Sequence, residues 1–383
     1  MNCDVTRHYD LLIEEGNDSV LDPPALQEYM NRWDGPRFID YLRTHLAGTP
    51  DASVLEVGVG TGRLALRVCK FCSDFTGIDL SPKSIATARE HLHSCTGTEL
   101  ICGDFLSHDF ERHFDAIYSS LTFMHIADKA LAIQKTADLL HPRGLFLLSM
   151  DKAQVATLDY GTRKIKIYSD DPNQIETLMQ TAGFAIAARW ETDAATAIAA
   201  RKLPQVIHII GASGSGTSTL ARALEARHGY KWMDTDGYFW APTDPPYQYS
   251  LPHAERLELM HAVMQKYPKC VISGSLCGWG DVFIPDFDLV IWLQAPTELR
   301  LERLRQRESL EFSARILPGG DMYENHQKFL AWAAAYDTGA LDMRSCALHA
   351  QWVRGLGCPV RILDSSKPFD ELVNAALEPM EMT

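Results

Sequence analysis

The chain has 383 residues, of which 46% are hydrophobic and 22% charged, enough apolar material for the cores of two or three domains. Its formal net charge is −14, and both halves of the chain are acidic. Because an acidic surface repels phosphate backbones and anionic lipids, this charge argues against nucleic acid or a membrane as partner and favours small-molecule substrates. The sequence indicates no oligomeric state.

The distribution of apolar residues and cysteines predicts a cytoplasmic protein. Residues 1–12 have two acids and no apolar core of signal-peptide length, and no run reaches the roughly 18 apolar residues of a membrane span. Nine cysteines without dense, regular spacing fit thiols in a reducing compartment. Cys69 and Cys72 form a CxxC pattern, but no second pair follows, so we expect a helix there rather than a metal or redox site.

Short apolar runs alternate with helical patterns from Ser53 to Met150, which is typical of a mostly parallel sheet covered by helices. Ser81 before Pro82 and Asp171 before Pro172 predict two helix starts, because each supplies an N-cap followed by proline at the first helical position. Two further apolar runs predict an antiparallel hairpin at a sheet edge. The expected strands cover residues 53–57, 75–80, 99–102, 114–120, 144–150, 183–190 and 195–202, and the expected helices 64–71, 81–92 and 129–140.

The segment KLPQ interrupts this pattern, and a strand, a glycine-rich loop and a helix then start a second series. We therefore place a boundary near Leu203 and predict two domains, residues 1–203 and 204–383. The second domain is expected to have strands at 206–210, 230–234, 270–273, 289–293 and 359–363. The predicted fold class is α/β, with two doubly wound domains.

The string VLEVGVGTGRLAL places Gly58, Gly60 and Gly62 where a buried strand turns into a helix, so that backbone can approach a ligand closely. Asp79 ends the next strand, 21 residues beyond Gly58, a distance typical of an acid that binds a ribose diol. A dinucleotide fingerprint would need Gly or Ala at position 63. Arg63 stands there, which argues against NAD.

The ExGxGxG pattern, the IDLS segment and the GDF triplet together resemble class I S-adenosylmethionine (SAM)-dependent methyltransferases over about residues 40–200. The resemblance implies a Rossmann-like sheet with the glycines at the amino-acid end of SAM, Asp79 on its ribose, and Asp104 and Phe105 at its adenine. A glycine turn in another doubly wound fold is the alternative. The expected SAM-binding residues are Glu56, Gly58, Gly60, Gly62, Asp79, Leu80, Asp104, Phe105 and Ser120.

The segment FDAIYSSLTFMHI matches the strand and loop where this family usually builds the acceptor side of its pocket, so Ser119, Ser120 and His125 are candidates there. His125 is the expected general base, since methyl transfer to a hydroxyl or amine releases a proton near neutral pH. A histidine buried for packing is the alternative. Because a sulfonium methyl group is already activated, alignment and exclusion of water are the only strict requirements. The N-terminal stretch resembles a lid, with Tyr9 as a contact.

The string VIHIIGASGSGTSTLARAL forms a second strand, glycine loop and helix, an arrangement that directs backbone N–H groups at phosphates. It resembles the Walker A loop of P-loop NTPases, which implies an ATP and Mg²⁺ site. It departs from that pattern at Thr217, where the motif requires a lysine, while Ser218 retains the position of the magnesium ligand. The expected nucleotide-binding residues are Gly211, Ser213, Gly214, Ser215, Gly216, Thr217, Ser218 and Thr219.

Residues 205–375 broadly resemble nucleoside- and shikimate-kinase-like enzymes. MDTDGYFW is similar to their DxD motif, which implies that Asp234 holds hydrated magnesium and Asp236 holds the phosphate acceptor. Arg300, Arg303 and Arg307 recur at i, i+3 and i+7, so a helix would present them on one face, as in a lid over the triphosphate. Arg303 is the expected catalytic cation. A solvated helix with interleaved glutamates is the alternative.

Three hypotheses follow from the two glycine loops. In the first, the chain is a bifunctional enzyme that methylates a small molecule in one domain and phosphorylates one in the other. In the second, a methyltransferase carries a nucleotide-sensing domain without turnover, as Thr217 suggests. In the third, both halves only bind their ligands.

Overall fold

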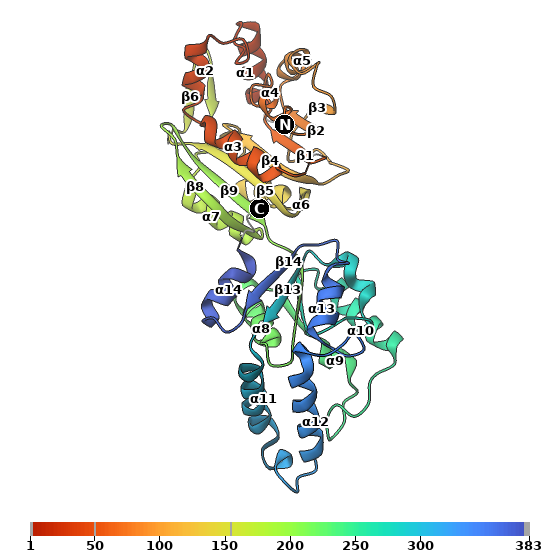
Figure 1. The fold of residues 1–383 in the computed structure, drawn as a ribbon. Coiled ribbons are helices and arrows are strands. Elements are labelled where there is room, and N and C mark those ends of the chain that lie inside the picture. The colour runs from red at the N-terminus through yellow and green to blue at the C-terminus, as the bar shows by residue number, and fades with distance from the viewer. Residues whose placement is uncertain (1–2, 50, 154, 379–383) are drawn as a thin grey trace. The chain divides into compact units, whose positions relative to one another are not determined.

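The structure, a computed structural model, describes residues 3–49, 51–153 and 155–378, and it divides into two compact units, 3–203 and 204–378 (Figure 1). Each unit is built on its own central sheet. None of the helices in the described ranges is both long enough and apolar enough to cross a bilayer.

The described residues of the first unit form nine strands: β1 (Ser53–Val57), β2 (Asp74–Asp79), β3 (Thr98–Cys102), β4 (Phe114–Ser120), β5 (Leu140–Asp151), β6 (Thr157–Asp159), β7 (Lys164–Lys166), β8 (Phe184–Glu191) and β9 (Ala195–Lys202). Its helices are α1 (Cys3–Glu14), α2 (Pro24–Met30), α3 (Gly35–Leu46), α4 (Ala65–Val68), α5 (Pro82–His91), the 3₁₀ helix η1 (Phe123–His125), α6 (Lys129–Leu139) and α7 (Pro172–Thr181).

Seven of these strands form one sheet in the order β3-β2-β1-β4-β5-β9-β8, and β6 and β7 pair separately. The sheet is parallel from β3 to β5, while β9 is antiparallel to both β5 and β8. The predicted edge hairpin is therefore confirmed. Strand order reverses between β1 and β4, which is the place where doubly wound sheets bind ligands.

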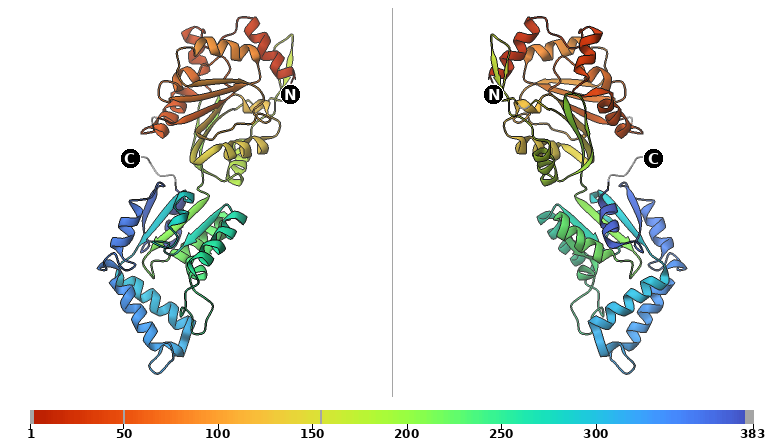
Figure 2. Two further views of the ribbon diagram at one scale, coloured as in Figure 1. Left: turned by 90° about the vertical axis from the view of Figure 1, so that its right-hand side faces the viewer. Right: turned by 90° about the vertical axis from the view of Figure 1, so that its left-hand side faces the viewer.

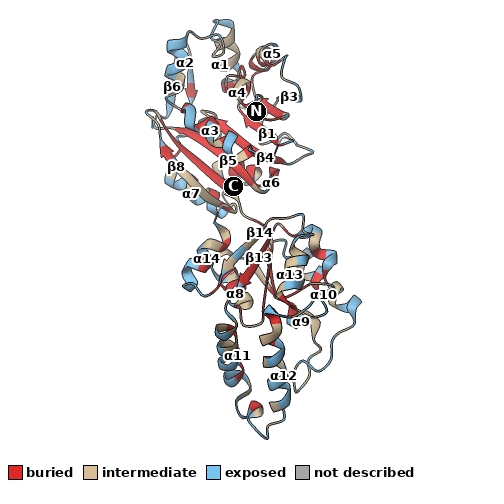
Figure 3. Cartoon of the chain, viewed as in Figure 1, coloured by how far each residue is buried: buried red, intermediate tan, exposed pale blue. Residues whose placement is uncertain are grey.

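Helices cover both faces of this sheet, as Figures 1 and 2 show. Phe38 and Leu42 of α3 pack with α4 and α5 on one face, and Ile133 of α6 and Met179 of α7 pack on the other. The central strands β1, β2, β4, β5 and β9 are mostly buried (Figure 3), as expected for strands with helices on both sides, whereas the edge strands β3 and β8 are partly exposed.

The two predicted helix starts are confirmed, because Ser81 accepts a hydrogen bond from Ser84 N and the Asp171 side chain accepts one from Asn173 N. The helix expected at 64–71 is shorter, Ala65–Val68, since the chain turns after it to enter β2. Cys69 and Cys72 follow this helix, and no disulfide joins the cysteines that the structure describes.

The second unit has five strands: β10 (Val206–Gly211), β11 (Lys231–Asp234), β12 (Cys270–Ser273), β13 (Leu289–Gln294) and β14 (Val360–Asp364). Its helices are α8 (Thr217–His228), α9 (Thr235–Phe239), α10 (His253–Lys266), η2 (Asp281–Asp286), α11 (Thr297–Phe312), η3 (Ser313–Ile316), α12 (Tyr323–Ala334), η4 (Ala335–Asp337), α13 (Cys346–Val353) and α14 (Phe369–Leu377).

These five strands form a parallel sheet in the order β11-β12-β10-β13-β14. Residues of α8 and α14 pack on one face of it, and residues of α10 and α13 pack on the other. Helices α11 and α12 extend from this sheet as a hairpin (Figure 1). The predicted class of two doubly wound α/β sheets is confirmed.

Candidate functional site

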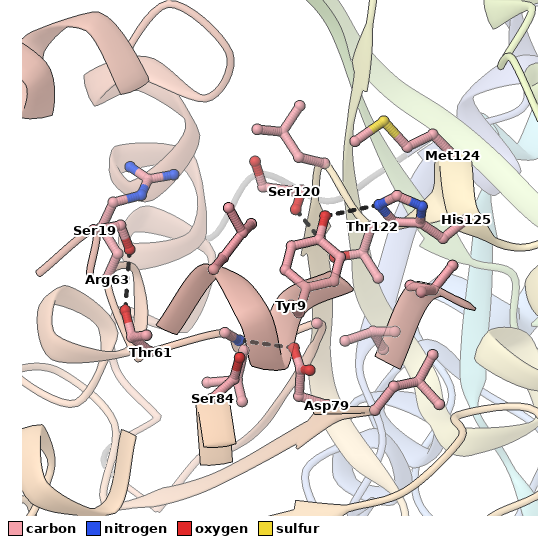
Figure 4. A pocket seen from close by; sticks show the side chains of 18 of the residues that line it. Tyr9, Ser19, Thr61, Arg63, Asp79, Ser84, Ser120, Thr122, Met124 and His125 are labelled. Atoms are coloured by element: carbon pink, nitrogen blue, oxygen red, sulfur yellow. Dashed lines mark hydrogen bonds between the residues drawn. The ribbon is translucent and has the colours of Figure 1, made fainter. Parts of the chain in front are cut away.

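A cavity of about 920 Å³ lies at the carboxyl ends of β1, β2 and β4 in the first unit (Figure 4). The structure brings together there most of the residues that the sequence predicts for SAM. Gly62 is the exception, because it packs toward α5, where a Cβ built on it would lie 3.4 Å from Leu92 Cδ1. The predicted residues that line the cavity are Glu56, Gly58, Gly60, Asp79, Leu80, Asp104, Phe105, Ser120 and His125.

The turn after β1 requires glycine at position 58. Gly58 has φ +84°, and a Cβ there would lie 1.8 Å from Thr122 Oγ1. The amides of Gly58 and Val59 both donate to the carbonyl of Ile78, which holds the turn against β2. At Gly60, by contrast, no described atom lies within 4 Å of such a Cβ, so the backbone there faces open cavity and fits a closely approaching ligand.

Asp79 is fixed at the end of β2 by two backbone amides. Its Oδ2 accepts from Gly60 N at 3.0 Å (Figure 4). Its Oδ1 accepts from Ser81 N at 2.9 Å. Burial raises the pKa of this carboxyl above its usual value. Each oxygen retains a further lone pair at the cavity wall, an arrangement that suits a ribose diol.

The loop after β3 supplies Asp104 and Phe105. The Asp104 carboxylate accepts a hydrogen bond from Leu106 N at 2.9 Å, and the Phe105 ring is 5% exposed, with Lys135 Nζ 5.6 Å from its centroid. Both residues line the cavity. A flat ring beside a hydrogen-bonding carboxylate fits an adenine that carries an amino group.

Glu56 is buried, and Tyr118 OH donates to its Oε2 at 2.7 Å. Burial raises the pKa of Glu56 well above its usual value. The sequence patterns did not identify Tyr118 as its partner, because the two residues lie 62 positions apart and meet only across β1 and β4.

The cavity also contains an ion pair that the sequence did not reveal. Arg63 pairs with Asp34, which is fully buried just before α3, and Ser120 Oγ donates to the same carboxylate at 3.1 Å. Arg63, whose side chain argued against a dinucleotide site, lines the cavity and has Asp34 as its structural partner. No spacing in the sequence links Asp34 to the glycine loop. Only the buried contact identifies it.

Tyr9 and His125 meet at the cavity wall, with Tyr9 OH 2.8 Å from His125 Nε2 (Figure 4). His125 is 9% exposed, and its Nδ1 has no hydrogen-bond partner among the described residues. Burial lowers the pKa of His125 to about 4 and raises that of Tyr9, so both side chains are neutral at pH 7.

Helix α1, which carries Tyr9, is anchored at two points after that residue. The Asp10 carboxylate accepts from Ser81 Oγ at 2.7 Å and from Lys83 N at 3.2 Å. Just after the helix ends, Arg163 donates two hydrogen bonds to the Glu15 carboxylate, at 2.6 and 2.7 Å. These contacts keep Tyr9 at the cavity.

Ser119 is not an acceptor-site residue, which corrects the sequence prediction. Its side chain is fully buried and donates to the Val57 carbonyl at 2.8 Å, so it joins β4 to β1. Alternating side chains of a strand point to opposite faces, and only the neighbouring Ser120 reaches the cavity.

The second glycine loop connects β10 to α8. Gly214 has φ +81°, and a Cβ there would lie 2.5 Å from the carbonyl oxygen of Arg300, so the loop packs tightly against α11. Gly216 caps α8, whose first turn contains no acid. Ser215 is fully buried, and its Oγ has no partner among the described residues, while Thr219 is exposed. The start of α8 therefore offers an anion site without the lysine that Thr217 replaces.

Ser218, Asp234 and Ser273 meet at the carboxyl ends of the second sheet. Ser218 Oγ lies 3.5 Å from both Asp234 Oδ2 and Ser273 Oγ. Burial raises the pKa of Asp234, with the exposed Asp236 adding to the shift, and Asp236 N donates to Asp234 Oδ1 at 3.2 Å. A hydroxyl and one carboxylate fit Mg²⁺ that also keeps water and phosphate ligands. No group of three or more His, Cys, Asp or Glu suited to a metal occurs in the described ranges.

The prediction that three lid arginines share one exposed face of the helix is wrong for Arg300. Its side chain is fully buried and donates to the Ala295 and Ala333 carbonyls and to Asp337, so it fastens α11 to the end of α12. Arg303 instead donates to the carbonyl of Ser365 after β14 at 2.8 Å, and Arg307 is largely exposed. The helix packs against the glycine loop and α12, which removes its first arginine from solvent.

Comparison with known proteins agrees with this architecture. A family model described as a methyltransferase domain matches residues 55–148, and one described as an AAA domain matches residues 207–316. The fold and sites thus define a class I SAM-dependent methyltransferase joined to a P-loop NTPase that resembles nucleoside and shikimate kinases. More particularly, an uncharacterized protein of Bacillus subtilis, YqaC, is 41% identical over 172 residues, which are 45% of this chain and 95% of that protein. The chain belongs to the family of that protein.

Other relatives match shorter stretches. A cytidylate kinase of Thermococcus sibiricus is 26% identical over 33% of this chain and 69% of its own length. A ubiquinone biosynthesis O-methyltransferase of Xanthomonas campestris is 31% identical over 33% of this chain, which spans 59% of that enzyme. A solved magnesium protoporphyrin IX methyltransferase from Synechocystis with bound SAM superposes with a TM-score of 0.43 and 16% identity, over 52% of this chain and 96% of that one.

Proposed function

We propose that the first unit transfers a methyl group from SAM to a hydroxyl oxygen of a small-molecule acceptor. The observation that carries this proposal is the single cavity in which Asp79, Asp104 and the glycine loop adjoin the Tyr9 and His125 pair. Similarity to an enzyme named as an O-methyltransferase supports oxygen as the accepting atom.

The residues present fit SAM and divide its binding among three elements. Gly60 gives the ligand room at the end of β1, Asp79 binds the ribose hydroxyls after β2, and Asp104 with Phe105 holds the adenine after β3. SAM supplies an activated methyl group on a positively charged sulfur. Carboxylates around the cavity favour that positive charge.

Tyr9 and His125 provide a route for the proton that the acceptor loses. As the new carbon–oxygen bond forms, the acceptor proton passes to Tyr9 O, and the Tyr9 proton passes to His125 Nε2. The neutral histidine has an available lone pair at pH 7 because burial lowers its pKa to about 4. So weak a base suits a proton released late, when the oxygen that gains the methyl group becomes strongly acidic.

The test of methyl transfer uses the full chain, methyl-labelled SAM and a deproteinised metabolite extract, with products resolved by mass spectrometry. We expect one labelled product, heavier than its precursor by one methylene unit. Absence of any labelled product across extracts prepared from several growth conditions would contradict the proposal.

The second unit supports a second function, binding of ATP with Mg²⁺ and phosphorylation of a small molecule. The supporting observation is the convergence of Ser218 and Asp234 beside the start of α8. Asp236 is the proposed ligand of the phosphate acceptor, and Arg303 is the proposed catalytic cation. Thr217 supports the alternative, a domain that binds nucleotide without turnover. ATP consumption that requires an added acceptor distinguishes phosphorylation from sensing.

Substitution Thr217→Lys tests how much the missing charge limits nucleotide binding. We expect it to tighten ATP binding at least about fivefold, because an ammonium group at this position would face the phosphates. The matched control is Ala226→Lys, which adds the same charge at an exposed position near the other end of α8. Equal effects of both variants in ATP titrations, or no gain at Thr217, would contradict an ATP site of this geometry.

A further inference from the structure

The cavity of the first unit is lined by many more acidic than basic side chains. Seven carboxyl residues line it, whereas Arg63 is the only lysine or arginine among its described lining residues. The carboxyl residues are Asp18, Asp22, Glu56, Asp79, Asp104, Asp128 and Asp151.

Arg63 is not available to an incoming anion. Its guanidinium pairs through two nitrogens with the two carboxylate oxygens of Asp34, a residue with no exposed surface. Taking Arg63 from this pair would leave a buried carboxylate without its cation, which is costly. The arginine is therefore already neutralised within the protein.

We call the part of the cavity that follows β4 and β5 its acceptor side, and it includes Asp128 and Asp151. Neutral groups rather than cations hold these two carboxylates. Asp151 accepts from Ala153 N at 2.7 Å, and Asp128 accepts from Leu131 N at the start of α6. Backbone amides orient a carboxylate but leave its negative charge in place. The nearby Lys129 pairs with Asp170 and does not line the cavity.

Several other residues that line the cavity are aromatic or apolar. Tyr29 and Trp33 stack edge to face with centroids 5.1 Å apart, and Tyr160, Tyr168 and Met124 line the same cavity. Such walls bind a flat or apolar body, with Tyr9 and His125 as neutral polar groups among them.

We propose that the methyl acceptor enters this cavity without a phosphate group, as a neutral or cationic molecule with an aromatic or apolar body. The inference rests on the proposed methyl transfer and deepens it. On any molecule used by both units, methyl transfer therefore precedes phosphoryl transfer, because a phosphorylated molecule would meet carboxylates and no available cation in this cavity.

A divided extract tests this proposal. One half of a deproteinised metabolite extract is treated with alkaline phosphatase, and EDTA is then added to both halves to inactivate the phosphatase and to remove the Mg²⁺ that phosphoryl transfer needs. Both halves are incubated with the full chain and methyl-labelled SAM. We expect the same labelled product in both halves, at equal or greater yield after phosphatase treatment.

A labelled product that appears in the untreated half and is lost from the treated half would overturn the inference while leaving methyl transfer intact. No labelled product in either half would instead overturn the proposed function, and this inference with it. The two failures are thus distinguishable.

A pair of variants tests the charge argument in the same assay with untreated extract. Asp151→Asn removes a carboxylate from the cavity, and Asp138→Asn removes an exposed carboxylate from α6. We expect the labelled fraction of phosphorylated molecules to rise at least about fivefold with Asp151→Asn. It should not change with Asp138→Asn. Equal product profiles for both variants would overturn the role of cavity charge.

Discussion

Tyr9 and His125 are 116 positions apart in the chain, yet their side chains meet at 2.8 Å on the cavity wall. Substitution Tyr9→Phe removes the hydroxyl and keeps the ring, so it separates proton transfer from packing. We expect the rate of labelled-product formation to fall about a hundredfold, while the affinity for S-adenosylhomocysteine changes less than about twofold. The matched control is Tyr29→Phe in the same cavity. A Tyr9→Phe variant as fast as the control would exclude the proton route.

Single residues could be predicted where a short motif defines them. Gly58, Gly60 and Asp79 lie at the cavity because strand ends and turns bring motif residues to one edge of a parallel sheet. Asp34 could not be predicted, since its importance arises from a buried contact with Arg63 that joins α3 to the glycine loop. Ser119 was misassigned because the motif does not resolve which of two adjacent strand residues faces the ligand.

Helices and strands with a clear hydrophobic period were predicted well, but the contacts that they make with other elements were not. The edge hairpin of β8 and β9 follows from two short apolar runs joined by a turn. Helix α11 was also expected, but its spacing could not show that the glycine loop packs on its first turn and that α12 encloses Arg300. Tertiary packing therefore changed the role of an arginine whose helical position was predicted correctly.

Substitution of Arg300 tests its structural role at the junction of α11 and α12. We expect Arg300→Ala to lower the free energy of unfolding of the second unit by about 3 kcal/mol, because it removes a buried side chain that donates to the Ala295 and Ala333 carbonyls and pairs with Asp337. Arg307→Ala, at a largely exposed position of the same helix, should change it by less than about 0.5 kcal/mol. Urea unfolding measures both values. Similar losses for the two variants would contradict the buried role of Arg300.

Across the whole molecule, buried histidines predict a loss of stability in acid. Burial lowers the pKa of six buried or half-buried histidines in the folded state: below its usual value for His228, to about 4 for His8, His45, His125 and His349, and to about 3 for His208. Below the unfolded pKa of about 6.5, the unfolded chain binds more protons than the folded one. Stability is therefore complete above that pH and falls as the pH drops toward 4.

The substitution His349→Gln tests whether a buried histidine lowers stability in acid. His349 lies in the second unit, where its two ring nitrogens contact Tyr336 OH and Ser275 Oγ. We expect the variant to be less stable than the unmodified chain at pH 7 but to lose about 1–2 kcal/mol less between pH 7 and pH 5. Exposed His93→Gln serves as the control in the same urea unfolding series. An equal pH dependence in all three proteins would contradict the lowered pKa.

Methyl transfer by the first unit requires that its cavity binds SAM. Calorimetric titration of S-adenosylhomocysteine, which lacks a transferable methyl group, into the full chain measures that site directly. We predict one site per chain, affinity at least about tenfold lower in Asp79→Ala, and no change in Asp138→Ala, because Asp79 alone of this pair lines the cavity. No binding, or equal affinity in Asp79→Ala and the unmodified chain, would contradict the assignment of this cavity to SAM.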